Sequence, residues 1–359
     1  MIRSLTKRSA WLLVLLALAV PRVTQAKDPV ISVEVMEPAK YELPGMKKIA
    51  VTPFKGPRGQ EVSARLTAKL FEGKQYTLLE RDQIDAIMKE HSLGVVEGIV
   101  DQAQAAEVGR MAGVDALVFG QVDDCKVVDA QSMTVIKKGI GAEGQPDVFV
   151  EAPTTTRTGH ISVTFKVVNI QSGQIAAIEN VVKEWSGKQI NDPRPDVQCA
   201  LCYLFAKNPM SESITLPSEN EVAGQIIDAA TLEFVHAISP HTVKVDLFWD
   251  KDVGKEGEMV MNYFNSGMTP EAKEAMIALR DKILANPKSE PKHRAAAYYD
   301  CGLSHEITGD LEKALVEYKS AVQESIKLGK KPDENHMAAM RRIQGRIEQS
   351  KKLQNQTGG

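Results

Sequence analysis

The segment Val114-Asp-Ala-Leu-Val-Phe-Gly-Gln-Val122 carries the clearest secondary-structure signal in this 359-residue chain. Its nearly continuous apolar and β-branched residues predict a buried strand. The Ala-rich residues 103–113 before it predict a short helix that ends at a glycine. After it, residues 160–170 and 174–185 predict two more strands, joined by a Gly-containing turn at 171–173. These segments predict a domain built on a sheet.

The same alternation of strands and helices extends toward the N-terminus. Residues 48–53 predict a buried strand, and the apolar spacing from Val62 predicts a helix that ends at Gly73. A strand is predicted at 76–79, and a helix capped by an aspartate at 82–90. The order of these elements predicts an α/β (α+β) architecture.

Two long segments interrupt this pattern before its last elements. Residues 131–159 and 187–217 are rich in Gly, Pro and charged residues, and the simplest interpretation is two surface loops. A helix at 218–236 is then predicted, in which Ser218 and Glu221 have the spacing of a capping box. A strand at 242–248 follows.

Beyond residue 250 only helical patterns occur, so we place a domain boundary there, between domains at 27–250 and 251–359. Small and aromatic residues in this region have the spacing of a tetratricopeptide repeat, in which small residues let two antiparallel helices approach and aromatics fill the gap. The resemblance predicts an all-α domain that binds protein partners, whereas fewer than three repeats would make only a structural appendage. The repeat-packing positions are Tyr298, Gly302, Gly309, Ala314, Tyr318 and Ala321.

The N-terminus has the charged, apolar and cleavage-site order of a secretory signal at residues 1–26. Its apolar run is shorter than the roughly 20 residues that span a bilayer. We therefore expect a periplasmic protein, with any association with the outer membrane not mediated by a transmembrane helix. The net charge of −3 gives no case for nucleic-acid binding.

Four cysteines are present, and Cys199 and Cys202 have the spacing of a close pair. The pair is compatible with a local disulfide or two buried thiols, with pairing to Cys125 or Cys301, or with redox or metal chemistry. No histidines stand in an i, i+4 metal pair, and no nucleophile or phosphate-binding motif occurs. We expect no enzyme activity, catalytic residue, cofactor or resident metal.

Four ordered motifs within residues 46–246 resemble those of the CsgG/HfaB family of curli-secretion and holdfast-anchoring proteins. They begin at Lys48 (KIAVTPF), Tyr76 (YTLLERDQI), Gly113 (GVDALVFGQV) and Phe165 (FKVVNIQSGQI). The resemblance implies a three-layer α/β domain with a mixed sheet in a Gram-negative cell envelope. It also implies a role in secretion or surface assembly.

The chain departs from that family at two points. Lys27 stands where the lipoprotein members of the family carry a cysteine, and charged residues and prolines interrupt the segments 131–159 and 187–217, which match the family's membrane hairpins. We therefore prefer a periplasmic adaptor or assembly factor that binds protein partners in the cell envelope, and we count a homo-oligomer among its expected forms. An oligomeric outer-membrane secretion channel is the alternative. A regulator of cell-wall synthases is a further alternative, because exported activators of these enzymes share a similar α/β domain.

Overall fold

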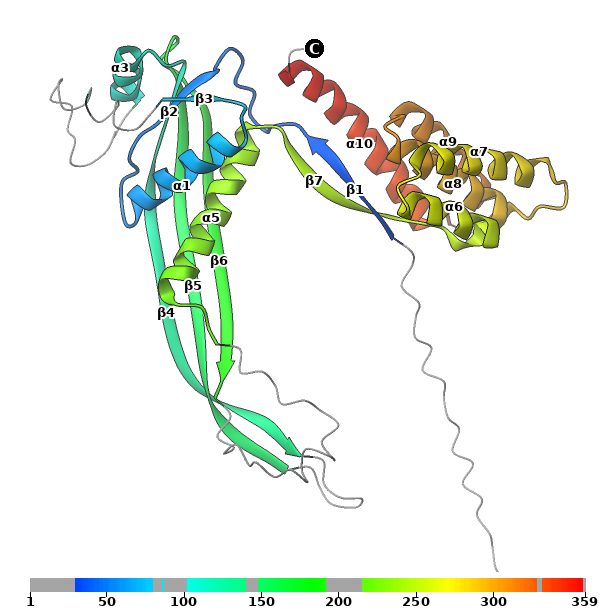
Figure 1. Ribbon diagram of the computed structural model, residues 1–359, viewed down its shortest axis with the longest axis horizontal. Coiled ribbons are helices and arrows are strands. Elements are labelled where there is room, and N and C mark those ends of the chain that lie inside the picture. The colour runs from blue at the N-terminus through cyan, green and yellow to red at the C-terminus, as the bar shows by residue number, and fades with distance from the viewer. Residues whose placement is uncertain are drawn as a thin grey trace, which may run out of the picture. The chain divides into compact units, whose positions relative to one another are not determined.

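The computed structural model describes residues 30–79, 86, 102–139, 148–191, 215–327 and 331–357 (Figure 1). These residues divide into two compact units. The sheet unit contains residues 34–244 together with 344–357, and the helical unit contains residues 245–343 together with 30–33. No helix among the described residues is long and apolar enough to cross a membrane.

The sheet unit is built on five strands in the order β3-β2-β4-β5-β6. Strand β2 pairs in parallel with β3 and β4, whereas β4, β5 and β6 form an antiparallel meander. The predicted mixed sheet is therefore confirmed. The bounds are Lys48–Val51 for β2, Thr77–Leu78 for β3, Ala116–Gly139 for β4, Val148–Asn169 for β5 and Ile175–Ile190 for β6.

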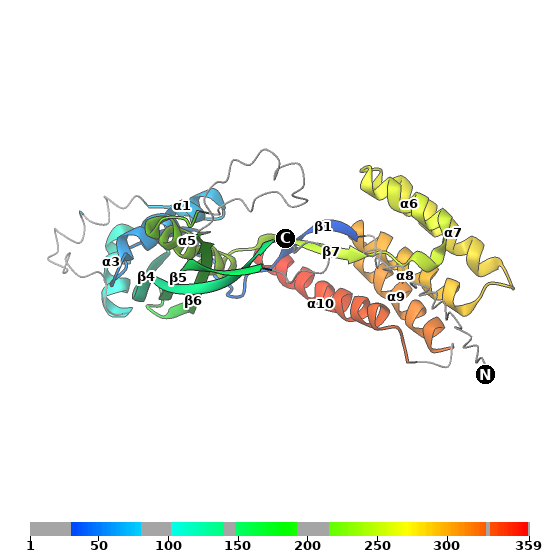
Figure 2. The same ribbon diagram turned by 90° about the horizontal axis from the view of Figure 1, so that it is seen from below.

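Helices cover both faces of this sheet. Helices α1 (Gly59–Glu72) and α5 (Glu219–Ile238) lie side by side on one face (Figures 1 and 2). Helix α3 (Gln102–Ala112) packs on the other face. Alternate residues of β4 explain this arrangement, because Val118 belongs to the core under α1 and α5, while Leu117 belongs to the core under α3. The unit therefore has three layers.

Helix α5 starts where its sequence predicts. Ser218 accepts a hydrogen bond from the backbone N–H of Glu221, and the Glu221 carboxylate accepts one from the backbone N–H of Ser218. This reciprocal pair satisfies two backbone donors that the first helical turn leaves free. Hydrogen bonding to Ser218 also lowers the pKa of Glu221.

The prediction of a surface loop at 131–159 is wrong. Residues 131–139 and 148–159 extend β4 and β5 as a long antiparallel hairpin, paired as far as Gly139 and Val148. A ladder forms through backbone groups, so it tolerates the polar side chains that suggested a loop. Residues 187–190 likewise continue β6, and residues 192–214 of the second predicted loop lie outside the described part of the chain.

A separate two-stranded sheet pairs β1 (Val30–Glu37) with β7 (His241–Phe248). Strand β7 was predicted from the sequence, whereas β1 was not. Its signal was the period-two alternation of the segment VISVEVME, in which Ile31 is buried while Val33 and Val35 are partly buried.

The helical unit consists of a short 3-10 turn and a series of helices joined by tight turns. Helix α7 packs against α6 and α8, and α8 packs extensively against α9. The turn after α8 requires a left-handed residue, which Gly309 supplies with φ +81°. The bounds are Lys251–Val253 for η1, Lys255–Asn265 for α6, Thr269–Ala285 for α7, Pro291–Ile307 for α8, Leu311–Ile326 for α9 and Glu334–Thr357 for α10. Helix α10 begins in the helical unit, and its residues from 344 on are counted with the sheet unit.

Candidate functional site

The α8–α9 hairpin contains the repeat-packing positions named from the sequence. Gly302 faces the ring of Tyr318, and a Cβ atom added to it would lie 2.8 Å from Tyr318 Cδ1. Ala314 and Ala321 are completely buried beside this crossing, and the partly buried Tyr298 packs against the same cluster. The small residue at 302 therefore sets how closely the two helices approach.

A buried ion pair attaches α10 to this hairpin. The Glu306 carboxylate, which is completely buried, accepts hydrogen bonds from Arg342 Nε at 3.0 Å and NH2 at 2.8 Å. The Tyr318 hydroxyl donates to the same carboxylate at 2.6 Å. Burial alone would lower the pKa of Arg342, but Glu306 raises it. Burial also raises the pKa of Tyr318, so the hydroxyl stays protonated and donates.

Ser325, His336 and Asp250 form a hydrogen-bonded series that resembles a hydrolase triad. Ser325 Oγ lies 2.9 Å from His336 Nδ1, and His336 Nε2 lies 3.2 Å from Asp250 Oδ2. This series was not predicted from the sequence, because its members lie far apart in the chain. Burial alone would raise the pKa of Asp250, but its hydrogen bond with His336 keeps it below the usual range.

This series is built for structure and not for nucleophilic attack. Ser325 is buried, and its hydroxyl donates to the Ala321 carbonyl of its own helix. The hydroxyl lies near the C-terminal end of α9, where free carbonyls and not N–H donors would face an oxyanion. His336 also stacks on Tyr299 with ring centroids 4.7 Å apart. The geometry therefore anchors the start of α10.

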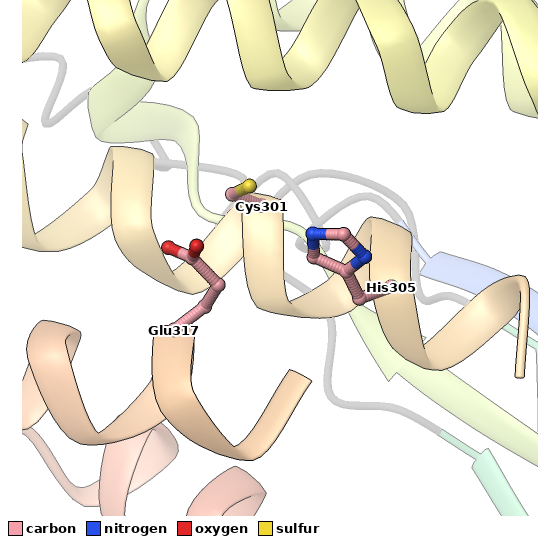
Figure 3. Close-up of side chains that lie close together, drawn as sticks. All are labelled: Cys301, His305 and Glu317. Carbon is pink, nitrogen blue, oxygen red and sulfur yellow. The ribbon is translucent and has the colours of Figure 1, made fainter. Parts of the chain in front are cut away.

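A second buried cluster in the helical unit joins Cys301, His305 and Glu317 (Figure 3). One potential ligand atom from each residue lies within 4.8 Å of the others. This cluster was not predicted from the sequence, where its one signal is the spacing of four residues between Cys301 and His305. No other group of this kind occurs in the part of the chain that the structure describes.

The two cysteines of the described residues are free thiols, Cys125 partly buried and Cys301 buried. Burial raises the pKa of both thiols, that of Cys301 to about 12. The predicted pair Cys199 and Cys202 lies outside the described residues.

A shallow hollow of about 370 Å³ lies between α1 and α5 in the sheet unit. Its charged side chains neutralise one another, because Arg65 bonds to Asp228 at 2.5 Å and to Glu61 at 2.9 Å. The charge of Arg65 is therefore already balanced within the protein. The lining residues are Arg65, Asn220, Glu221, Gly224, Gln225 and Asp228.

The β4–β5 hairpin exposes several large apolar side chains. Val128, Met133, Val135 and Phe149 are each more than half exposed. Polar neighbours separate them, since Val135 pairs with Glu151 across the ladder and Asp129 forms an ion pair with Arg157. The hairpin is thus a mixed apolar and charged surface.

Residues 23–192 match the family described as curli production assembly/transport component CsgG. The matched segment includes β1 to β6 and stops before α5. It confirms the resemblance for this part of the chain. The match supports a non-catalytic protein of the cell envelope.

Three solved structures from bacteria show a weak similarity to parts of this chain. The LpoB C-terminal domain from Salmonella enterica has 11% identity and a TM-score of 0.25, covering 39% of this chain and 86% of that one. The PelC dodecamer from Paraburkholderia phytofirmans has 12% identity and a TM-score of 0.22, covering 59% and 99%. A lipoprotein from Neisseria meningitidis has 12% identity and a TM-score of 0.22, covering 45% and 99%. Similarities of this size do not transfer function, and no curated protein matches the chain.

Proposed function

We propose that this chain is a non-catalytic periplasmic adaptor or assembly factor for secretion or surface structures. The observation that carries the proposal is the CsgG match over residues 23–192, which falls on the layered sheet unit. The buried side-chain series at Ser325 supports a non-catalytic role, because its serine is tied to its own helix.

We assign the binding of protein partners to the helical unit. The close α8–α9 crossing at Gly302 resembles the packing of tetratricopeptide repeats, which present surfaces to peptides and proteins. The unit also exposes apolar side chains that its own core leaves uncovered. They are Met259, Met268, Val316 and Ile326, of which Val316 is the most exposed at 62%.

Affinity capture from an envelope extract with the full chain tests this assignment. Val316→Asp places a charge on the outer surface of α9 without disturbing the core, and we expect it to reduce partner recovery by at least about tenfold. Leu232→Asp is the matched control, because Leu232 is an exposed apolar residue on α5 of the sheet unit. Equal recovery with both variants would contradict a binding role for the helical unit.

The exposed apolar residues of the β4–β5 hairpin favour a second candidate function, an oligomeric secretion channel. Fractionation and conductance measurements separate the two. An adaptor is released with the soluble periplasm and forms no ion-conducting pores in lipid bilayers. Recovery in outer membranes together with pore formation would favour the channel.

Self-association is a further part of the proposal. Strand β6 is an edge strand of the sheet and exposes Ile178 and Val182, a combination that promotes pairing with a second copy. In light scattering, the purified chain should have the mass of an oligomer, and the Val182→Lys variant should have a lower mass. A monomeric mass for the unmodified chain would contradict self-association.

A further inference from the structure

Three side chains that commonly bind transition metals meet between two helices of the helical unit. Cys301 and His305 are four residues apart on α8, so they lie on one face of that helix. Glu317 reaches them from α9, the helix that packs against α8 (Figure 3). Potential ligand atoms of all three lie within 4.8 Å of one another.

This cluster is buried and has unused bonding capacity. Cys301 is completely buried, and the His305 side chain is 7% exposed. Glu317 Oε2 is a buried atom that has no hydrogen-bond partner. Buried polar atoms are normally paired, so a free carboxylate oxygen beside a thiol and an imidazole points to a missing ligand.

We propose that Cys301, His305 and Glu317 form a metal site that takes zinc. A thiolate, an imidazole and a carboxylate are all ligands that zinc accepts, and three protein ligands leave a fourth tetrahedral position for water. Two anionic ligands would balance the charge of a divalent ion. The ligand atoms must move closer than they are now for all three to reach one ion.

Arg280 is the cation that now neutralises the cluster. Its NH1 group donates to Cys301 Sγ at 3.2 Å and to Glu317 Oε1. The same guanidinium bonds to the exposed Asp281 through Nε at 2.9 Å and NH2 at 2.7 Å. It can therefore keep Asp281 as its partner when a metal ion replaces NH1. The thiol proton of Cys301 leaves to solvent as the sulfur–metal bond forms.

A carboxylate stands where it can orient the imidazole. His305 Nδ1 lies 3.5 Å from Asp310 Oδ2, and Lys273 holds Asp310 by an ion pair. A metal-binding histidine commonly donates its second ring N–H to such a carboxylate. Nδ1 is then the donor, and Nε2 is left as the ligand.

Cobalt titration of the full chain tests the site, in a Cys199→Ser/Cys202→Ser background that removes the other cysteine pair. We expect a thiolate-to-cobalt charge-transfer band that saturates at one ion per chain and disappears when zinc is added. Cys301→Ser should abolish the band, and Glu317→Gln should weaken binding at least about tenfold. Asp310→Asn should weaken it about 10–100-fold. Arg280→Gln should tighten it, because the competing cation is gone.

His293→Gln and Cys125→Ser are the matched controls. His293 is an exposed histidine on the same helix, and Cys125 is the other free thiol of the described residues. Both variants should bind cobalt as the background does. Circular dichroism checks folding, and Glu317→Gln carries the test if Cys301→Ser loses helix. A folded chain without the band, or a band that survives Cys301→Ser, would overturn the proposal.

Discussion

Replacing Gly302 by alanine tests how tightly the α8–α9 crossing is packed. In an uncrowded helix position, replacing glycine by alanine stabilises the folded state by about 1 kcal/mol, because glycine loses more backbone freedom on folding than alanine does. Here the new Cβ would lie 2.8 Å from Tyr318 Cδ1 and 2.9 Å from Cε1. The ring cannot move aside easily, because it is completely buried and its hydroxyl is bonded to Glu306.

Overpacking of a core costs about 1–3 kcal/mol, and the short distances at Gly302 favour the upper end of this range. After subtraction of the helix-propensity gain, we expect Gly302→Ala to lower the free energy of unfolding by about 2 kcal/mol. Gly345→Ala is the matched control. Gly345 lies in α10 just after Arg342, which bonds this helix to Glu306 of the helical unit, and no atom lies within 4 Å of an added Cβ. Its replacement should raise the free energy of unfolding by about 1 kcal/mol.

Tryptophan fluorescence during urea unfolding can follow the helical unit alone. Trp249 is buried in its core, and Trp185 belongs to the sheet unit. With Trp185→Phe, in a chain that starts at Lys27 and so lacks Trp11, the signal comes from Trp249. Opposite shifts of the midpoint for the two glycine variants are expected. A stabilising effect of Gly302→Ala would refute the close crossing.

Three further predictions concern caps, buried charge and pH. Ser218→Ala should lower the free energy of unfolding of the sheet unit by about 1 kcal/mol through loss of the capping box, and an unchanged urea midpoint would contradict it. Arg342→Met should lower the free energy of unfolding of the helical unit by about 3 kcal/mol, because Glu306 would remain charged and buried. A decrease below about 1 kcal/mol would show that the ion pair does not stabilise the unit. Burial and the neighbouring His241 lower the pKa of His236, so the folded state disfavours its protonation and the sheet unit should lose stability as pH falls below about 6.5. In NMR titrations, His241→Gln should raise the pKa of His236, and an unmoved titration would exclude that coupling.

Sequence patterns located most elements because local chemistry decides their ends. The capping box at Ser218 and Glu221 fixed the start of α5, and the glycine at 309 marked the turn between α8 and α9. The strand pattern at 114–122 correctly predicted the start of β4. The helical region after residue 250 was therefore predictable from local patterns, whereas the mixed sheet was implied by the resemblance to the CsgG/HfaB family.

Other features depend on pairing that no local pattern encodes. The extension of β4 and β5 through 131–139 and 148–159 rests on backbone hydrogen bonds, so its polar side chains concealed it. Glu317 meets Cys301 only because two helices pack against each other, and the i, i+4 spacing of Cys301 and His305 was the one signal available in the sequence. Contacts between distant residues required the folded arrangement.

The binding role of the helical unit is tested most directly by photo-crosslinking in cells. A photo-activatable amino acid replaces Val316 on α9 in one full-length variant and Leu232 on α5 in another, both exposed apolar positions. The proposed adaptor predicts a specific covalent adduct with another envelope protein from position 316 and not from position 232. Adducts from neither position, or the same adducts from both, would contradict it.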